Sequence, residues 1–369
     1  MIEPGRSNGT AQATAPISKV TKLPSAKPPK RRKPRALPDD LLWRSSEEAA
    51  RRLALKSLGA ARTAERRLDD RFDREALHDF RVAVRRLRSV LRAYKVELAE
   101  VVSPKDRKRL RTIQRATGAG REAEVALKWL KKQHGTLAPE HVAGLNWLSA
   151  ILLERRRRCS NDLDAQLRAS FRTLIDQMEE RLAIMRSEQN LLTENTVASF
   201  ARCAGDLTDA HADELQRVLG HIANLDDTER LHEGRICGKR LRYLLEPLRP
   251  YVNEAQPIVK RTKQLQDVLG DLNDVHVLMS EIDTAIQRSM SERADRIRRA
   301  LAGRDFERAR REAVMIEWSG LLELHLRLET ERTELIATLR DNWLSGGLDL
   351  LVSKARGLAR HLRHLDQPN

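Results

Sequence analysis

Two segments of this sequence carry the same pattern of histidine and basic residues. Residues 77–88 read Leu-His-Asp-Phe-Arg-Val-Ala-Val-Arg-Arg-Leu-Arg, and residues 231–242, which start 154 positions later, read Leu-His-Glu-Gly-Arg-Ile-Cys-Gly-Lys-Arg-Leu-Arg. Cationic side chains at regular intervals bind anions, and the planar guanidinium group of arginine matches the oxygens of a phosphate. The repeated segment therefore indicates a site for an anionic ligand.

On a helix, the basic side chains of each segment share one face. The first ridge, as we call this face in the first segment, covers an arc of about 80° and consists of His78, Arg81, Arg85, Arg88 and Arg92. The second ridge consists of His232, Arg235, Lys239 and Arg242. The opposite face of the first segment is apolar and consists of Phe80, Val84, Leu87 and Leu91. Each helix is expected to bury one face and to present cations on the other, and two such ridges repel each other unless an anion lies between them.

The composition is that of a strongly basic globular protein. The chain has 369 residues, a net charge of +16 and a pI near 10.2. Its 40% of hydrophobic residues is enough to bury a core, and its 33% of charged residues requires a charged surface. Such a field attracts polyanions without selecting among them.

The cysteines and the apolar segments indicate where the protein resides. Cys159, Cys203 and Cys237 are far apart and form no Cys-x-x-Cys pair, which argues against a disulfide framework or a zinc knuckle. The sequence contains neither the apolar core of a signal peptide nor a run of about 18 apolar residues. We therefore expect a cytoplasmic protein that is not integrated into a membrane. The sequence leaves the oligomeric state open.

Residues 1–38 differ in composition from the rest of the chain. They are rich in Pro, Ser, Thr, Ala and Lys and cannot bury a core, so we expect a disordered basic arm. Within residues 1–35, nine basic residues and the single acidic residue Glu3 give a charge of +8, half of the total. The arm could bind a polyanion or serve as a solubilising tail.

From Asp39 onward the sequence is typical of an all-α protein. Leu, Ala and Val recur with helical period among Arg and Glu, and Pro or Gly stands mainly at the breaks. The pattern predicts helices over residues 41–69, 75–98, 104–133, 139–158, 161–187, 194–218, 226–249, 255–285, 290–302, 306–340 and 347–364.

The repeat extends beyond the two cationic helices. Residues 118–125 match residues 270–277 at an offset of 152 positions. We therefore predict a helical bundle over residues 39–365, with halves at about 39–190 and about 191–365. A pseudo-twofold axis would relate the halves and place both ridges in a basic central groove. Gly234 and Gly238, on the packed face of the second cationic helix, indicate close approach to another helix.

The doubled pattern carries a family resemblance. Two copies of His-x-x-Arg-x-x-x-(Arg/Lys)-Arg-x-Arg, with Leu-Gln-x-x-Leu-Gly-x-x-Asn-Asp-x-x-Val at residues 265–277, resemble the CHAD family, the conserved histidine α-helical domain. The resemblance covers about residues 40–350. It implies a helical bundle with internal pseudo-symmetry that binds inorganic polyphosphate in a basic groove, and it makes polyphosphate granules a candidate location. The implied binding residues are His78, Arg81, Arg85, Arg86 and Arg88, then His232, Arg235, Lys239, Arg240 and Arg242.

The residues themselves favour polyphosphate over nucleic acid. Polyphosphate has about one charge per phosphate and no bases, so its receptor needs repeated guanidinium donors and little else. Proteins that bind single-stranded nucleic acids stack bases on aromatic rings. Aromatic residues are scarce here, and only Tyr94 and Tyr243 stand near the ridges. A basic helical protein that binds nucleic acid, at least weakly, and a scaffold for acidic protein partners remain the alternatives.

The two histidines have three candidate roles. His78 and His232 could donate to a phosphate, with a positive charge below about pH 6.5, ligate a metal, or act as acid and base. Neither has a second histidine four residues away, and the further ligands of a metal phosphohydrolase are missing. We therefore favour phosphate binding or helix packing, and predict a protein without catalytic residues, metal site or cofactor that is not an enzyme.

Overall fold

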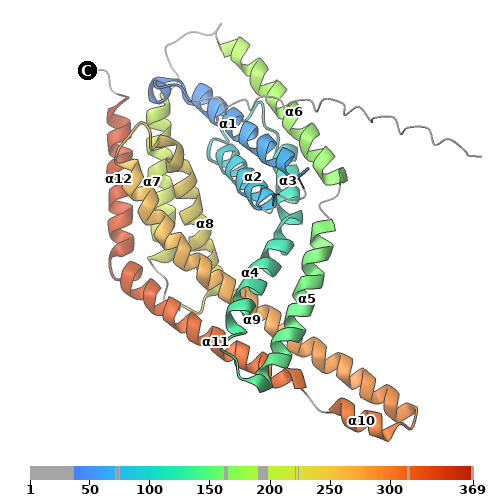
Figure 1. Cartoon of the computed structure of the whole chain (residues 1–369). Helices are drawn as coiled ribbons and strands as arrows, with labels where there is room; N and C mark the ends of the chain where they lie inside the picture. The colour runs from blue at the N-terminus through green and yellow to red at the C-terminus, as the bar shows by residue number, and fades with distance from the viewer. Residues whose placement is uncertain are drawn as a thin grey trace, which may run out of the picture. The chain divides into compact units, whose positions relative to one another are not determined.

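The computed structural model of the chain describes residues 37–70, 73, 75–161, 165–189, 198–220, 222, 224–313 and 316–366. These residues form helices joined by turns and include no β-strand; one antiparallel bridge pairs Ser45 with Ser199. The all-α prediction is confirmed (Figure 1). The α-helices are α1 (Ser46–Arg67), α2 (Ala76–Ala93), α3 (Pro104–Ala116), α4 (Gly118–Gln133), α5 (Val142–Asn161), α6 (Ala165–Gln189), α7 (Phe200–Leu219), α8 (Thr228–Leu245), α9 (Ala255–Ala302), α10 (Phe306–Ala313), α11 (Ile316–Leu339) and α12 (Gly347–His364).

Local sequence signals set several helix ends. Ser103 and Asp106 form a capping box at the start of α3: the Ser103 hydroxyl accepts from the Asp106 amide at 3.2 Å, and the Asp106 carboxylate accepts from the Ser103 amide at 2.9 Å. The carboxylate of Asp227 caps α8 by accepting from the Arg230 amide at 3.0 Å. Pro247 follows the end of α8. These signals fix where α3 begins and where α8 begins and ends.

The structure divides two parts of the chain into helices differently from the prediction. The segment 104–133 is two helices, because the Thr117 hydroxyl donates to the Gln114 carbonyl at 2.9 Å where glycine-rich sequence follows. The helix α9 continues through the break predicted between residues 285 and 290, since Ala285 and Ser289 continue its buried face. Within the segment 306–340, the structure describes α10 and α11, and residues 314–315 between them lie outside the described ranges.

Two hydrophobic cores hold the helices together. The larger core includes buried side chains of α1, α2, α3, α6, α7, α8, α12 and the first half of α9. The smaller core joins α4, α5, α11 and the middle of α9. Helices from both predicted halves of the sequence thus contribute to each core.

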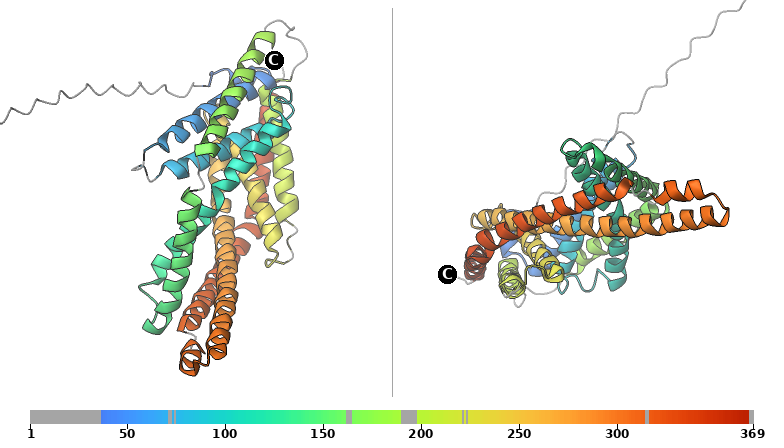
Figure 2. Two further views of the ribbon diagram at one scale, coloured as in Figure 1. Left: turned by 90° about the vertical axis from the view of Figure 1, so that its right-hand side faces the viewer. Right: turned by 90° about the horizontal axis from the view of Figure 1, so that it is seen from below.

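The long helix α9 connects the two cores. Its 48 residues correspond to about 72 Å of helix. Leu269 and Leu272 belong to the larger core, and Val275 and Leu278 belong to the smaller one. Further along the chain α9 packs beside α11 (Figure 2). Although α9 is long, it carries too many charges to span a membrane, and no other helix in the described ranges has a span of the required length and hydropathy.

Corresponding helices of the two predicted halves pack in the same order. α1 contacts α2 and α6, and α7 contacts α8 and α12. Likewise, α4 contacts α5, and α9 contacts α11. The pseudo-twofold axis itself stays a prediction, and the predicted boundary between the halves, near residue 190, borders residues outside the described ranges.

The predicted basic arm, residues 1–38, lies outside the described residues except for Leu37 and Pro38. A hydrogen bond holds the first described residues against the helices: the Tyr251 hydroxyl donates to the Pro38 carbonyl at 2.8 Å. Leu37 packs at the edge of the larger core. The helical region therefore begins at about the residue where the composition changes.

Two glycines allow α5 and α11 to cross at close range in the smaller core. A Cβ atom on Gly144 would lie 2.4 Å from the Glu317 carbonyl oxygen, and a Cβ atom on Gly320 would lie 2.1 Å from the His141 carbonyl oxygen. Real Cβ contacts are never that short, so any side chain at these positions must push the two backbones apart.

The first testable prediction concerns this crossing. We expect Gly320→Ala to lower the free energy of unfolding by about 1–3 kcal/mol, because the added methyl group meets backbone that has no rotamer to change. Urea denaturation followed by circular dichroism measures this loss. Gly59→Ala is the matched control, since a Cβ atom there meets nothing within 4 Å. Equal stability of the two variants would contradict the close crossing of α5 and α11.

Candidate anion-binding site

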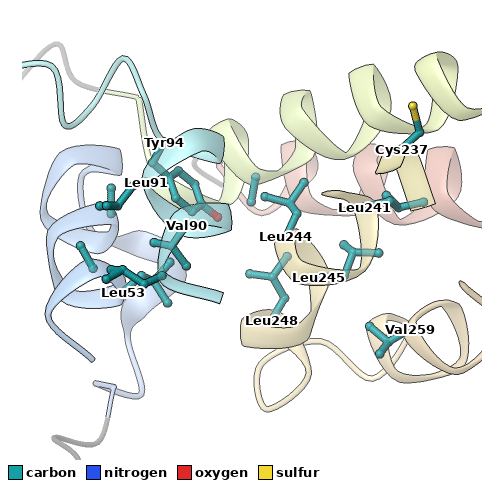
Figure 3. Close-up of a cluster of buried hydrophobic side chains, with 14 of the residues drawn as sticks. Leu53, Val90, Leu91, Tyr94, Cys237, Leu241, Leu244, Leu245, Leu248 and Val259 are labelled. Atoms are coloured by element: carbon teal, nitrogen blue, oxygen red, sulfur yellow. The ribbon is translucent and has the colours of Figure 1, made fainter. Parts of the chain in front are cut away.

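Apolar contacts bring the two cationic helices together. Phe80, Val84, Leu87 and Leu91 of α2 are all buried, as predicted. Beyond them, α2 packs against α8. Figure 3 shows Val90 of α2 and Tyr94, the residue after its end, on one side, with Leu244 of α8 and Leu248, three residues beyond its end, on the other. The hydrophobic faces therefore fix the distance between the two ridges.

The glycines of α8 bring this helix close to its other neighbours. A Cβ atom on Gly234 would lie 2.3 Å from Cδ2 of Leu219 in α7, and one on Gly238 would lie 3.4 Å from Cγ of Gln266 in α9. The predicted close approach is confirmed at Gly234, whereas a Cβ atom on Gly238 would make only an ordinary van der Waals contact. Because α7 and α9 cover the glycine face, the cationic side chains of the second ridge are directed elsewhere.

Cations from both ridges meet around one lysine. Burial, followed by the charges of Arg235, Arg85 and Arg242, lowers the pKa of Lys239 to about 7, while the charge of Asp274 opposes this shift. Burial also lowers the pKa of Arg235. The charge of Asp274 raises this pKa, and the charge of Arg85 lowers it. We call Arg85, Arg235, Lys239 and Arg242 the central cluster. Its members come from both copies of the repeated segment.

The central cluster contains hydrogen-bond donors that have no acceptor. The Nε atoms of Arg85, Arg235 and Arg242 are buried and have no hydrogen-bond partner. Arg242 Nε does lie 3.4 Å from a carboxylate oxygen of Glu246, at a distance that reflects charge attraction. A buried donor without an acceptor costs about 1–3 kcal/mol. An anion that supplies acceptor oxygens would remove this cost.

Further arginines extend the cluster along α2. Burial and the charge of Arg121 lower the pKa of Arg81, whose Nη1 donates to the Gly118 carbonyl at 3.4 Å. At the next turns, burial and the charge of Arg111 lower the pKa of Arg88. Desolvation and the charge of Arg240 have the same effect on the pKa of Arg92. The cations of α2 therefore form a row that continues on both sides of Arg85.

Sequence analysis did not assign three arginines that the structure places beside the first ridge. Arg111 and Arg115 on α3 act on Arg88, and Arg121 on α4 acts on Arg81. Their signal was present in the sequence, because Arg111 and Arg115 are four residues apart on one helix and Arg121 lies in the longer repeat. Without knowledge of how α3 and α4 pack on α2, these residues resemble any charged helix surface.

The two histidines and Arg86 do not belong to the central cluster. His78 is exposed, and His232 places its Nδ1 atom 3.1 Å from Oδ1 of Asn273. Arg86 Nε lies 3.5 Å from a carboxylate oxygen of Glu246. Glu246 thus pairs with arginines of both cationic helices.

Arg240 points away from the central cluster and towards α7. Its Nη1 atom donates to Glu214 at 2.5 Å. His211 Nδ1 lies 3.5 Å from the other oxygen of Glu214. Within the described ranges no three His, Cys, Asp or Glu side chains gather in a way that suits a metal ion.

Comparisons with known proteins agree with the fold and the repeated motif. The model of the CHAD domain family matches residues 52–283, which is more than half of the chain. A similar solved structure is the crystal structure of the CHAD domain from the plant Ricinus communis, with 20% sequence identity and a TM-score of 0.57 over 89% of this chain and 96% of that chain. None of the curated proteins compared with this sequence matches it. The chain therefore belongs to the CHAD domain family.

Proposed function

We propose that this protein binds inorganic polyphosphate at the central cluster and along the first ridge, without catalysing a reaction. The observation that carries the proposal is that both copies of the repeated segment place cations around Lys239, although like charges repel. These cations also retain buried Nε donors without acceptors at Arg85, Arg235 and Arg242. A linear anion with many phosphate oxygens supplies both the missing charge and the missing acceptors.

The row of cations along α2 suits a long, flexible ligand. From Arg81 to Arg92 the helix rises about 16 Å. Arginines three and four residues apart stand about 5–6 Å from one another on the helix surface. Successive phosphates of one chain could therefore contact successive guanidinium groups, and cross to the second ridge at Arg235. In this proposal the two ridges line a basic groove shared by the two halves.

The aromatic residues near the ridges argue against the reading of bases. Tyr94 and Tyr243 are 1% and 6% exposed, so neither ring offers a face on which a base could stack. The guanidinium group of Arg242 lies 4.8 Å from the centre of the Tyr243 ring. A nucleic acid would therefore be held by its phosphates alone, with weaker and less selective binding.

Competition between polyanions tests the proposed function. We expect labelled long-chain polyphosphate to bind with an affinity that falls steeply as the salt concentration rises, because binding releases counterions from the polyphosphate. DNA or RNA, added in excess with its concentration counted per phosphate, is expected to displace little of the labelled polyphosphate. Fluorescence anisotropy measures both effects. Equal displacement by DNA would instead favour the nucleic-acid-binding alternative, and displacement by an acidic peptide would favour the scaffold.

The cellular part of the proposal is a cytoplasmic protein that associates with polyphosphate granules. Imaging of a fluorescent fusion in cells with and without polyphosphate tests it. We expect foci that disappear when polyphosphate is absent. Foci that persist in such cells would refute the association with granules and leave the binding proposal to be decided by the competition experiment.

A further inference from the structure

Lys239 differs from every other lysine in the described ranges. The others are exposed to solvent, whereas Lys239 is half-buried on α8. Arg235 and Arg242 stand four and three residues from it, on the same face of α8. The Nε atoms of Arg235 and of Arg85 on α2 are buried without an acceptor, and the charges of both arginines act on Lys239. Within those ranges, no carboxylate oxygen lies within the 4.0 Å of an ion pair with its amino group, although the charge of Asp274 on α9 acts on it from further away.

This arrangement has a chemical consequence for the amine. A lysine that is desolvated and placed beside other cations loses its proton readily and becomes a nucleophile. The pKa of Lys239, lowered to about 7, agrees with this geometry. A lysine in a model peptide has a pKa near 10.4. At pH 7 the neutral amine is therefore far more common at position 239 than in such a peptide.

We propose that Lys239 is a site of covalent acylation by small acyl phosphates. The arginines of the central cluster bind the phosphate group of the acyl donor and so bring its carbonyl carbon to the amine. The nitrogen of Lys239 attacks this carbon, a new C–N bond forms, and the bond between the carbon and the bridging oxygen breaks. Inorganic phosphate leaves, the nitrogen releases one proton to solvent, and Lys239 carries an amide.

The surrounding arginines assist each part of this step. They hold the leaving phosphate through charge-assisted hydrogen bonds. Their positive charge also stabilises the negative charge that develops on the carbonyl oxygen during attack. The reaction needs no oxidant, reductant or further reactant, because the acyl phosphate supplies both the acyl group and the leaving group.

Acylation would change the binding site. The amide has no charge and the added acyl group occupies space among the arginines. If the proposed polyphosphate function is correct, the modified protein binds polyphosphate more weakly, and bound polyphosphate protects Lys239. This consequence rests on the proposed function, whereas the reactivity of Lys239 does not.

The test uses the full chain and acetyl phosphate at pH 7, with peptide mass spectrometry to follow each lysine over time. We expect the initial rate at Lys239 to exceed that at the exposed Lys56 by at least about tenfold. Across a pH series from 6 to 8, the rate at Lys239 should reach half of its plateau near pH 7. Arg235→Gln, with its fold checked by circular dichroism, should slow acetylation at Lys239 and leave Lys56 unchanged.

The outcomes separate this proposal from the proposed function. Equal rates at Lys239 and Lys56, or a rate at Lys239 without the plateau, would overturn the acylation proposal while polyphosphate binding could still be observed. Selective acetylation of Lys239 that polyphosphate fails to prevent would keep the acylation site and count against the proposed function. Lys239→Arg serves as the control that keeps the charge and removes the nucleophile.

Discussion

Replacing Arg85 and Arg235 together by glutamine is expected to weaken polyphosphate binding by at least about 100-fold. Each guanidinium group contributes charge-assisted hydrogen bonds worth about 1.5–3 kcal/mol, and the two groups belong to different copies of the repeat. Both have buried Nε atoms without partners, so their removal breaks no hydrogen bond made by that atom in the free protein. Titration calorimetry with long-chain polyphosphate measures the change.

A matched variant separates the site from the overall charge. Arg298→Gln with Arg310→Gln removes the same charge from side chains that are 78% and 80% exposed near the end of α9 and on α10. We expect this variant to bind within about threefold of the original protein, because exposed charges act through screened fields. Both double variants should keep their helical content and melting temperature. Equal losses in the two variants would show that general charge, and not the central cluster, governs binding.

Raising the pH from 7 to 9 is expected to weaken polyphosphate binding by about 25- to 50-fold. In the free protein, burial and then Arg235, Arg85 and Arg242 hold the pKa of Lys239 at about 7, against the opposing charge of Asp274. A bound polyanion favours the charged amine and therefore raises this pKa. A raised pKa of about 9 corresponds to the 25-fold effect, and one of about 10.5 to the 50-fold effect. Binding then takes up a proton, so the affinity is highest below pH 7 and falls until the pH reaches the raised pKa.

Two measurements check this sign. Calorimetry at pH 8 in buffers of different ionisation enthalpy should report the uptake of close to one proton per bound site. Lys239→Arg keeps a positive charge throughout this range and should bind with nearly the same affinity at pH 7 and 9. Proton release on binding, or the same pH dependence in the arginine variant, would show that another group titrates.

The shift of Lys239 also affects the stability of the free protein. The unfolded chain binds a proton at this lysine between about pH 7 and its ordinary pKa of 10.5, whereas the folded chain does not. The contribution of Lys239 to the free energy of unfolding therefore rises with pH in this window. The affinity for polyphosphate and this contribution change in opposite directions, which distinguishes them experimentally.

Much of the fold could be predicted because it depends on local patterns. The apolar period of residues 80–91 predicted the buried face of α2, and Gly234 predicted the close packing of α8 against α7. The continuous course of α9 was not predicted. A break was expected between residues 285 and 290, although this stretch contains no glycine or proline. Packing of α9 against α10 and α11 keeps this stretch in one helix.

The sequence by itself determined which side chains form each cationic ridge, because a helix places residues three and four apart on one face. Only the tertiary structure decided which cations share a space. Arg85 acts on Lys239, 154 positions further along the chain, whereas Arg240, the neighbour of Lys239, turns to Glu214 on α7. The physical reason is that burial and charge pairing depend on which helices pack together. This packing is determined by the apolar faces of α2, α7, α8 and α9.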